Sequence, residues 1–182
     1  SVVVTFDHAC EAVLRGLNVR LPADIRVLSV EEAAPGFHAR FHATGKAYRY
    51  RVVTTPILMP FDRHTAWHVP WRLDVEAMRD AAARFVGTHD FASFQARGTR
   101  ITDTVRTLSR VDLTPGSGTL TLDVEGDGFL RHMVRTMAGT LVEIGSGQRR
   151  PEDVDAMFTA RSRDAAGKTA PAQGLTLVRV SY

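Results

Sequence analysis

Apolar residues along the chain recur with two different periods, which predicts a mixture of helices and strands. A spacing of three to four residues is typical of a helix with one buried face. It predicts helices over 8–17, 75–85 and 129–144, and a further helix that begins at Pro151. Asp74 is placed to cap the second of these helices, because its carboxylate can accept from free backbone N–H groups, and Gly87 is placed to end it.

Alternating or continuous apolar runs predict the strands. They cover 2–6, 25–30, 48–53, 65–69, 104–113, 119–124 and 175–180. The turn sequence Pro-Gly-Ser-Gly at 115–118 joins two of these strands into a β-hairpin. Strands joined by hairpin-type connections, with helices between them, favour an α+β fold: a largely antiparallel mixed sheet with helices packed on one face.

The dipeptide Pro35-Gly36 predicts a domain boundary. Residues 1–36 would then form a β-α-β unit, the remnant of an N-terminal domain, and residues 37–182 a second domain. A length of 182 residues suits one good core, or one domain with part of another.

Composition adds one bias. The formal net charge is only +3, but Lys46 and Lys168 are the only lysines among 23 basic residues, and the rest are arginines. The guanidinium group of arginine forms bidentate hydrogen bonds with phosphates and stacks on bases, so the bias fits RNA binding. A compositional preference of the genome explains it equally well, and the sequence leaves both explanations open.

Other classes of protein and site find little support. The single cysteine, Cys10, has no disulfide partner, which favours a reducing compartment, and no apolar run is long enough for a membrane span. Two pairs of histidines lie four residues apart, at His38/His42 and His64/His68, but in strand or loop patterns where that spacing does not form a metal site. The pair His89-Asp90 suits an acid/base role less well than a capping role for the next segment.

Four blocks of sequence carry a more specific signal. They are FHARF with ATGKAYRY at 37–50, HDFASF at 89–94, GFLRHMVR with the helix through Gly139 at 128–139, and APAQGL at 170–175; 102–108 is a weaker fifth. In their order and spacing these blocks resemble the TruA-type tRNA pseudouridine synthases over the whole chain. The resemblance implies a pseudouridine synthase-like fold, and a catalytic and RNA-binding role for residues 37–182.

The resemblance also implies a reaction. The N-glycosidic bond of a uridine is broken, the base turns, and the base is rejoined through carbon; a paired base must first be flipped out. An aspartate acts as the nucleophile, and an arginine paired with it keeps it ionised.

Individual residues match the motifs of the family. Tyr48 matches the active-site tyrosine, whose ring stacks on the uracil and whose hydroxyl is a candidate proton acceptor; on pattern alone either Tyr48 or Tyr50 could be a core residue. Arg135 matches the arginine that pairs with the aspartate, and Leu175 the apolar residue beneath the uracil. Without the resemblance, Arg135 would equally suit a solvated stripe with Arg131 and His132, and Leu175 a plain core position.

Further roles follow from the same blocks. Arg131, His132 and Lys46 are implied to bind substrate. The family uses neither a metal nor an organic cofactor. It acts as a cytoplasmic homodimer whose partner is the anticodon stem-loop of tRNA.

One departure from the family concerns the nucleophile. The family places its aspartate in a Gly-Arg-Thr-Asp segment just before a strand like 2–6, and this sequence begins after that point. Asp7, Asp90, Asp103 and Asp127 do not match the motif, so we expect no nucleophile within the chain and no partner for Arg135. A non-catalytic RNA-binding protein of the same fold, or a structural domain without RNA affinity, are the alternatives.

Overall fold

A computed structural model describes residues 8–182, which divide into two compact units. The first ends at Ala43 and the second begins at Thr44, whereas the sequence suggested a boundary after Gly36. The expected strand over 2–6 lies outside the described residues. In the part that the structure describes, no helix is long and apolar enough to cross a membrane.

The first unit contains the helix α1 (Cys10–Arg20), which has no buried residue. The strand predicted over 25–30 is wrong: this segment has no strand pairing. Instead, the side chain of Asn18 holds both backbone groups of Val27, accepting from its N–H at 2.9 Å and donating to its carbonyl at 2.8 Å. An amide side chain thus satisfies the polar groups that a neighbouring strand would have paired.

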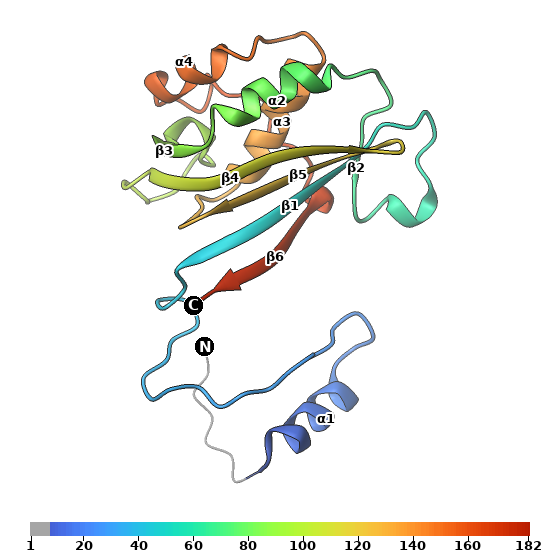
Figure 1. The fold of residues 1–182 in the computed structure, drawn as a ribbon, viewed down its shortest axis with the longest axis vertical. Helices are drawn as coiled ribbons and strands as arrows, with labels where there is room; N and C mark the ends of the chain where they lie inside the picture. Colours follow the sequence, from blue (N-terminus) through green and yellow to red (C-terminus); the bar gives the residue numbers. More distant parts are fainter. Residues whose placement is uncertain (1–7) are drawn as a thin grey trace. The chain divides into compact units, whose positions relative to one another are not determined.

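The second unit is built on one sheet (Figure 1). Its strands are β1 (Gly45–Val53), β2 (Trp67–His68), β3 (Gly87–Asp90), β4 (Val105–Gly116), β5 (Thr119–Gly126) and β6 (Leu175–Ser181). The order across the sheet is β2-β1-β5-β4-β3, and β6 also pairs with β1. Only β1 and β2 run parallel, so the mixed, largely antiparallel sheet predicted from the sequence is confirmed.

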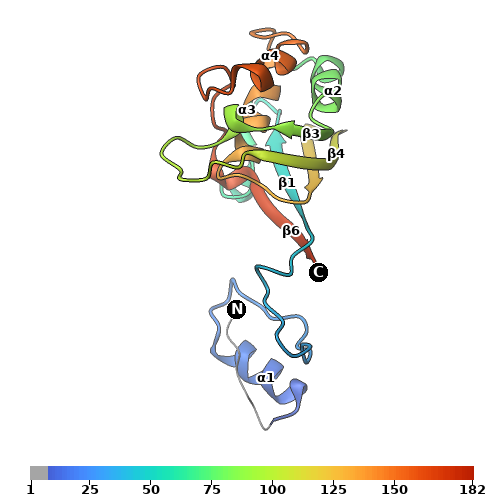
Figure 2. The same cartoon turned by 90° about the vertical axis from the view of Figure 1, so that its left-hand side faces the viewer.

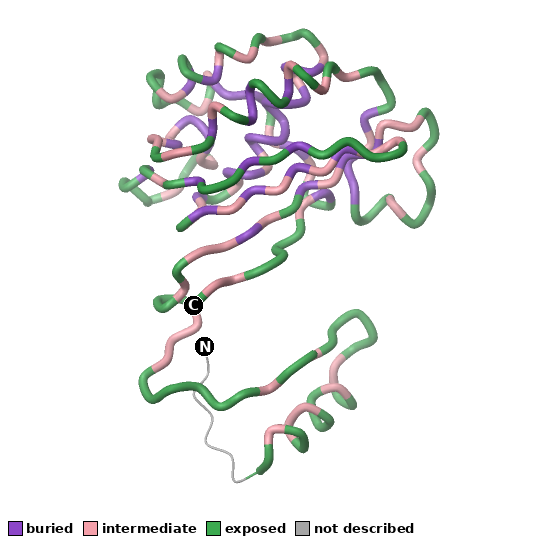
Figure 3. The backbone as a smooth tube through the Cα atoms, in the orientation of Figure 1, coloured by how far each residue is buried: buried purple, intermediate pink, exposed green. Residues whose placement is uncertain are grey.

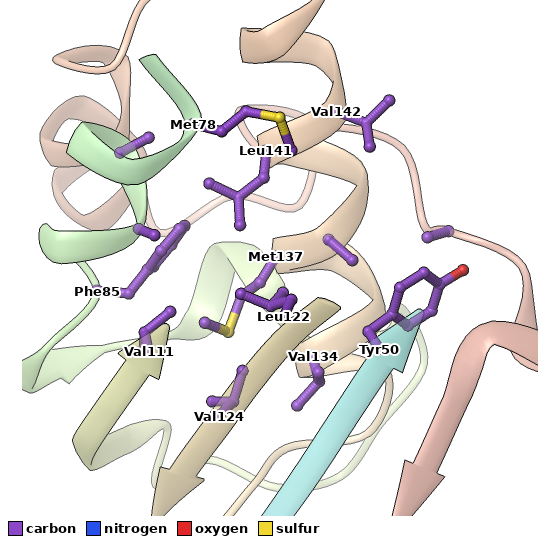
Figure 4. Close-up of a cluster of buried hydrophobic side chains, with 14 of the residues drawn as sticks. Tyr50, Met78, Phe85, Val111, Leu122, Val124, Val134, Met137, Leu141 and Val142 are labelled. Carbon is purple, nitrogen blue, oxygen red and sulfur yellow. The ribbon is translucent and has the colours of Figure 1, made fainter. Parts of the chain in front are cut away.

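Helices cover one face of this sheet, as predicted (Figure 1 and Figure 2). They are α2 (Val75–Ala83), α3 (Met133–Gly145) and α4 (Asp153–Ala160). The connections also contain three short 3-10 turns, η1 (Pro60–Asp62), η2 (Ala92–Phe94) and η3 (Ala172–Gly174). Buried residues concentrate where α3 meets the sheet (Figure 3). Met137 and Leu141 of α3 pack in the same core as Leu122 of β5 and Phe85 (Figure 4).

Local signals placed several elements correctly. Asp74 caps α2, accepting from the backbone N–H groups of Glu76 and Ala77 at 3.1 and 3.0 Å. The β4–β5 hairpin forms as predicted, and its turn tightens to residues 117–118, where Gly118 has φ +71°. Glycine suits that left-handed conformation because it has no Cβ.

Other boundaries differ from the prediction. The helix expected from residue 129 begins only at Met133, because His132 adopts a left-handed conformation with φ 65°. The helix expected from Pro151 begins at Asp153 after a turn. The sequence also missed β3, which pairs with β4 immediately after α2.

The face of the sheet opposite the helices carries paired charges. Arg49 of β1 binds Asp123 at 2.8 Å, and Glu125 of β5 receives Arg110 at 3.3 Å and Arg179 at 3.2 Å. Arg49 and Arg110 lie opposite their carboxylates in register on adjacent strands, whereas Arg179 of β6 reaches Glu125 across β1, where both are level with Ala47. The arginines of this face are therefore neutralised by carboxylates of the same face.

Candidate active site

Strand β1 presents Tyr48 and Tyr50 on the same face, because side chains two residues apart in a strand point the same way. Tyr50 is fully buried, and its hydroxyl donates to the carbonyl of Pro171 at 2.7 Å. Burial raises the pKa of Tyr50, and the charge of Arg135 opposes this. Figure 4 shows its ring within the core and its oxygen directed away from Met137 and Leu122. Tyr50 is thus the structural tyrosine of the pair.

Gly174 makes room for that ring. A Cβ on Gly174 would lie 2.6 Å from the Cζ atom of Tyr50 and 2.9 Å from the carbonyl oxygen of Arg51. Only glycine allows the turn η3 to approach β1 so closely. The glycine of the 170–175 motif therefore fixes where β6 begins.

Tyr48 has a different environment. It is half-buried, and its ring meets Phe129 edge-on, with the ring centroids 5.0 Å apart. Among residues 8–182 its hydroxyl has no hydrogen-bond partner, and none of its interactions goes beyond this packing. A ring that is fixed by packing and a hydroxyl without a hydrogen bond are suited to contact with a ligand. The sequence motif that singled out Tyr48 agrees with this placement.

Arg135 is held by the backbone. Its Nε donates to the carbonyl of Ala170 at 2.7 Å, while the N–H of Ala170 donates to the carbonyl of Arg135 at 3.0 Å. The expectation that Arg135 lacks a partner is therefore wrong, since a main-chain carbonyl serves. No carboxylate in residues 8–182 forms an ion pair with it, so its other N–H groups remain available to an anion.

A second glycine permits this link. A Cβ on Gly139 of α3 would lie 1.8 Å from the carbonyl oxygen of Lys168, closer than any real contact. The absence of that atom lets the segment 168–170 lie directly on α3. The approach puts the carbonyl of Ala170 within reach of Arg135, one turn earlier on the helix.

The three residues singled out as the centre of the site gather around Tyr50. Leu175 is the register partner of Tyr50 across β1 and β6. Tyr48 precedes Tyr50 by two residues on the same face, and Arg135 and the Tyr50 hydroxyl donate to the carbonyls of the adjacent residues Ala170 and Pro171. The fold therefore brings an aromatic ring, an apolar side chain and a guanidinium to one place.

Arg131 and His132 lie at the start of α3 and line a pocket of about 410 Å³. Burial lowers the pKa of His132, and the positive charges of Arg135, Arg131 and Arg163 lower it further. Sequence reasoning named neither Arg97 nor Arg163, which line the same pocket. The general excess of arginine was the only signal that pointed to them.

Lys46 lies apart from this pocket. It lines a separate hollow of about 460 Å³ together with Glu125 and Arg179. Of the residues expected to bind substrate, Arg131 and His132 are thus brought together, and Lys46 is not.

The remaining candidates have structural partners. Asp90 accepts from the N–H of Ala92 at 3.0 Å and pairs with Arg161 at 2.7 Å, so its capping role is observed. Asp103 and Asp127 accept from backbone N–H groups of the β4 strand. No group of three or more potential ligands among residues 8–182 could hold a metal ion.

Comparison with known proteins identifies relatives over most of the chain. The family model described as tRNA pseudouridine synthase matches residues 81–182. A tRNA pseudouridine synthase A from Bacillus pumilus (strain SAFR-032) is 49% identical over 166 residues, covering 91% of this chain and 67% of the relative. The protein of the same name from Geobacter sulfurreducens is 45% identical over 185 residues, covering 100% of this chain and 76% of the relative.

A third relative, the tRNA pseudouridine synthase A of Syntrophotalea carbinolica, is 47% identical over 167 residues, covering 92% of this chain. The chain spans about two thirds of the length of the first of these relatives.

Proposed function

Because the chain belongs to the tRNA pseudouridine synthase family, we propose that it supplies the base-binding and RNA-binding part of an enzyme that isomerises uridine to pseudouridine in tRNA. The observation that carries the proposal is the meeting of Tyr48, Arg135 and Leu175 around the buried Tyr50. The substrate we propose is the anticodon stem-loop, on the strength of the motifs at 43–50 and 128–135. Such a substrate would make the enzyme cytoplasmic.

The reaction breaks the bond between N1 of uracil and C1′ of the ribose and forms a bond from C5 to C1′. The proton on C5 is lost and N1 gains a proton, so substrate and product are isomers. Tyr48 stacks on the base, and its hydroxyl accepts the C5 proton while releasing its own proton to solvent, which supplies the proton that N1 gains. Leu175 supports the opposite side of the uracil, and Arg135 binds the carboxylate nucleophile and holds it ionised.

The nucleophile itself is not one of the aspartates that we can describe in this chain. Asp90, Asp103 and Asp127 are engaged elsewhere, and no carboxylate among residues 8–182 pairs with Arg135. We therefore expect the 182-residue chain to bind tRNA without modifying it. Release of the C5 hydrogen from tRNA labelled at that position measures turnover, and a rate well above background would overturn this assignment.

Tyr48 provides the sharper test of the chemistry. In an enzyme that carries the aspartate together with this chain, Tyr48→Phe should lower turnover about 10²–10⁴-fold, the usual contribution of an acid-base group, with tRNA affinity unchanged. Tyr50→Phe is the matched control, because it removes the same atom two residues away. It should leave turnover near the parent value and lower the thermal midpoint, since it loses the bond to Pro171. Equal turnover in all three proteins would leave the Tyr48 hydroxyl without a catalytic role.

A homodimer with the tRNA lying across both subunits is part of the same proposal. Sedimentation of the chain with and without tRNA measures its assembly state.

A non-catalytic RNA-binding protein of this fold is the second candidate function, favoured by the absence of a carboxylate beside Arg135 in the described residues. Such a protein would bind tRNA with a strong dependence on salt. It would differ from the proposed enzyme in one result: adding a segment that carries the aspartate would not produce turnover.

A further inference from the structure

The pocket beside Arg131 is assembled from three separate segments of the chain. Ala96 and Arg97 follow η2, Arg131 and His132 precede α3, and residues 163–169 follow α4. The first two segments are joined by a hydrogen bond from the N–H of Ala96 to the carbonyl of Arg131 at 2.9 Å. Convergence of distant segments on one hollow requires the tertiary fold, so no local motif reveals it.

Arg163 is fixed within this pocket. Its guanidinium donates to the carbonyl of Ala166 at 3.3 Å and to the hydroxyl of Thr169 at 2.8 Å. The residue is only partly exposed, and burial lowers its pKa, with the charge of Arg97 adding to this. An arginine held in this way loses little further side-chain freedom when it binds a ligand.

The charge of the pocket is not balanced from within. Its lining contains three guanidinium groups, those of Arg97, Arg131 and Arg163, against the single carboxylate of Asp164. Asp164 pairs with Arg97, but both side chains are largely exposed, with 77% and 71% of their surface in solvent. An exposed pair of this kind contributes little and can reopen. The pocket therefore favours an anion.

The shape and lining of the pocket indicate which kind of anion. No phenylalanine, tyrosine or tryptophan lines it, and its one ring is the imidazole of His132, so the lining favours the charge of a nucleotide over its base. Guanidinium forks match the oxygens of a phosphate, and Thr169 adds a hydroxyl. Contacts of this type hold a nucleic acid in register without reading its sequence.

The pocket is also linked to the candidate active site. Thr169, which binds Arg163, directly precedes Ala170, whose carbonyl holds Arg135. The hydroxyls of Thr169 and Thr136 lie 3.4 Å apart, which ties this segment again to α3. An anion bound by Arg163 would therefore act on the same short segment that positions Arg135.

We propose that this pocket, formed by Arg97, Arg131, His132, Arg163 and Thr169, binds one phosphodiester of the tRNA backbone next to the target uridine. The inference rests on the proposed function, and names a backbone contact that accompanies base binding by Tyr48 and Leu175. Arg131 and Arg163 bind the phosphate oxygens. Asp164 competes with the phosphate for Arg97 and is displaced when the RNA binds.

The first test measures the affinity of the chain for unmodified tRNA over a range of salt concentrations. Arg163→Gln and Arg131→Gln should each weaken binding about tenfold or more, as expected for the loss of a charge-assisted hydrogen bond. Each should also lower the slope of log affinity against log salt by about 0.7–0.9, the value for one phosphate contact. Arg110→Gln on the open sheet face changes the net charge equally and should leave the slope as in the parent chain.

Asp164→Asn gives a test of opposite sign. It removes the competing carboxylate, so tRNA affinity should increase while the chain stays folded. Circular dichroism spectra and thermal midpoints check the fold of every variant.

Because Arg163→Gln also loses two internal hydrogen bonds, Arg131→Gln is needed as a variant that loses none. The side chain of Arg131 is exposed, and no hydrogen bond holds it within residues 8–182.

A synthetic anticodon stem-loop with single uncharged methylphosphonate linkages locates the phosphate. One linkage beside the target uridine should weaken binding to the parent chain and have no further effect on Arg163→Gln. If the parent chain binds tRNA but the Arg131 and Arg163 variants keep its affinity and salt slope, the phosphate pocket is refuted while the proposed function stands. If the parent chain shows no salt-dependent tRNA binding, both are refuted.

Discussion

Two groups of arginines in the second unit differ in how their charge is balanced. On the open face of the sheet, Arg49, Arg110 and Arg179 each pair with a carboxylate of strand β5, either Asp123 or Glu125. Around the start of α3, Arg131, Arg135 and Arg163 have main-chain or hydroxyl partners, or none, among the described residues, and no carboxylate pairs with them. The same residue type thus serves two purposes within one unit.

The difference shows why the arginine content alone says little about RNA binding. A guanidinium paired with a largely buried carboxylate, such as Asp123 or Glu125, gains little from a phosphate, because the carboxylate would be left unpaired and poorly solvated. The exposed carboxylate of Asp164 is displaced more easily. An unpaired guanidinium held by the backbone keeps its free N–H groups directed at a ligand. Pairing across the fold, rather than the number of arginines, separates a structural surface from a binding surface.

The largest expected effect comes from Arg135. In an enzyme that supplies the aspartate, Arg135→Ala should lower turnover by at least about 10²-fold, because a fixed donor to the reacting carboxylate is lost. Arg135→Lys should rescue poorly, since a single ammonium cannot bind both the Ala170 carbonyl and a carboxylate with the same geometry. Steady-state rates measure this. Turnover near the parent value in the alanine variant would show that Arg135 has a structural role and no role in catalysis.

In the chain by itself, Arg135→Met removes the contact with the Ala170 carbonyl, a partner that the sequence did not predict. We expect it to lower the free energy of unfolding by about 0.5–1.5 kcal/mol, the net value of an ordinary hydrogen bond. Urea unfolding measures the change. An unaltered midpoint would show that the bond to Ala170 adds nothing to stability.

The next effect concerns the close packing of segment 168–170 on α3, which holds Arg135 in place. Gly139→Ala inserts a methyl group 1.8 Å from the Lys168 carbonyl, and such overpacking costs about 1–3 kcal/mol or more. It should lower both the thermal midpoint and tRNA affinity, because the segment that holds Arg135 is displaced. Gly45→Ala is the control: its Cβ would meet the Gly126 carbonyl oxygen at 3.4 Å, an ordinary contact. Equal stability of the two variants would contradict the close packing of this segment.

His132 makes the unpaired group sensitive to pH. Its pKa in the free chain lies below the ordinary value, owing to burial and then to Arg135, Arg131 and Arg163. The unfolded chain therefore binds a proton at His132 more readily than the folded chain does. The contribution of neutral His132 to the free energy of unfolding is lost as the pH falls through the ordinary histidine range. A bound phosphate would raise the pKa of His132, so tRNA affinity should increase modestly over the same fall in pH.

Binding measured at several pH values, with His132→Gln as the control, tests this linkage. The pH dependence of affinity should be smaller in the variant than in the parent chain. Identical pH profiles would mean that no anion approaches His132.

The smallest effect is expected on the open sheet face. Arg110→Gln leaves Glu125 paired with Arg179, and Asp112 is exposed to solvent, so no buried charge is left alone. We expect little change in the thermal midpoint and an unchanged salt slope for tRNA. A slope that fell as far as in Arg131→Gln would place RNA on this face and remove the distinction between the two groups.

Signals contained in short segments correctly predicted much of the second unit. The cap at Asp74, the hairpin turn ending at Gly118 and the alternating strand at 175–181 depend on neighbouring residues, so the sequence determined them. The same holds for the fold class. The choice of Tyr48 over Tyr50 as the active-site tyrosine comes from the motif that contains it and stays a prediction. In the first unit, the strand predicted at 25–30 failed because pairing requires a partner strand, and Asn18 takes up those backbone groups instead.

Contacts between distant segments were decided only by the tertiary structure. The bond between Arg135 and Ala170 spans 35 residues and depends on the missing Cβ of Gly139. The pocket around Arg163 draws on three segments that no sequence period connects. Likewise, cross-strand register decided which arginines meet a carboxylate. Electrostatic pairing depends on distance in space, and distance in space between remote residues is a property of the folded chain alone.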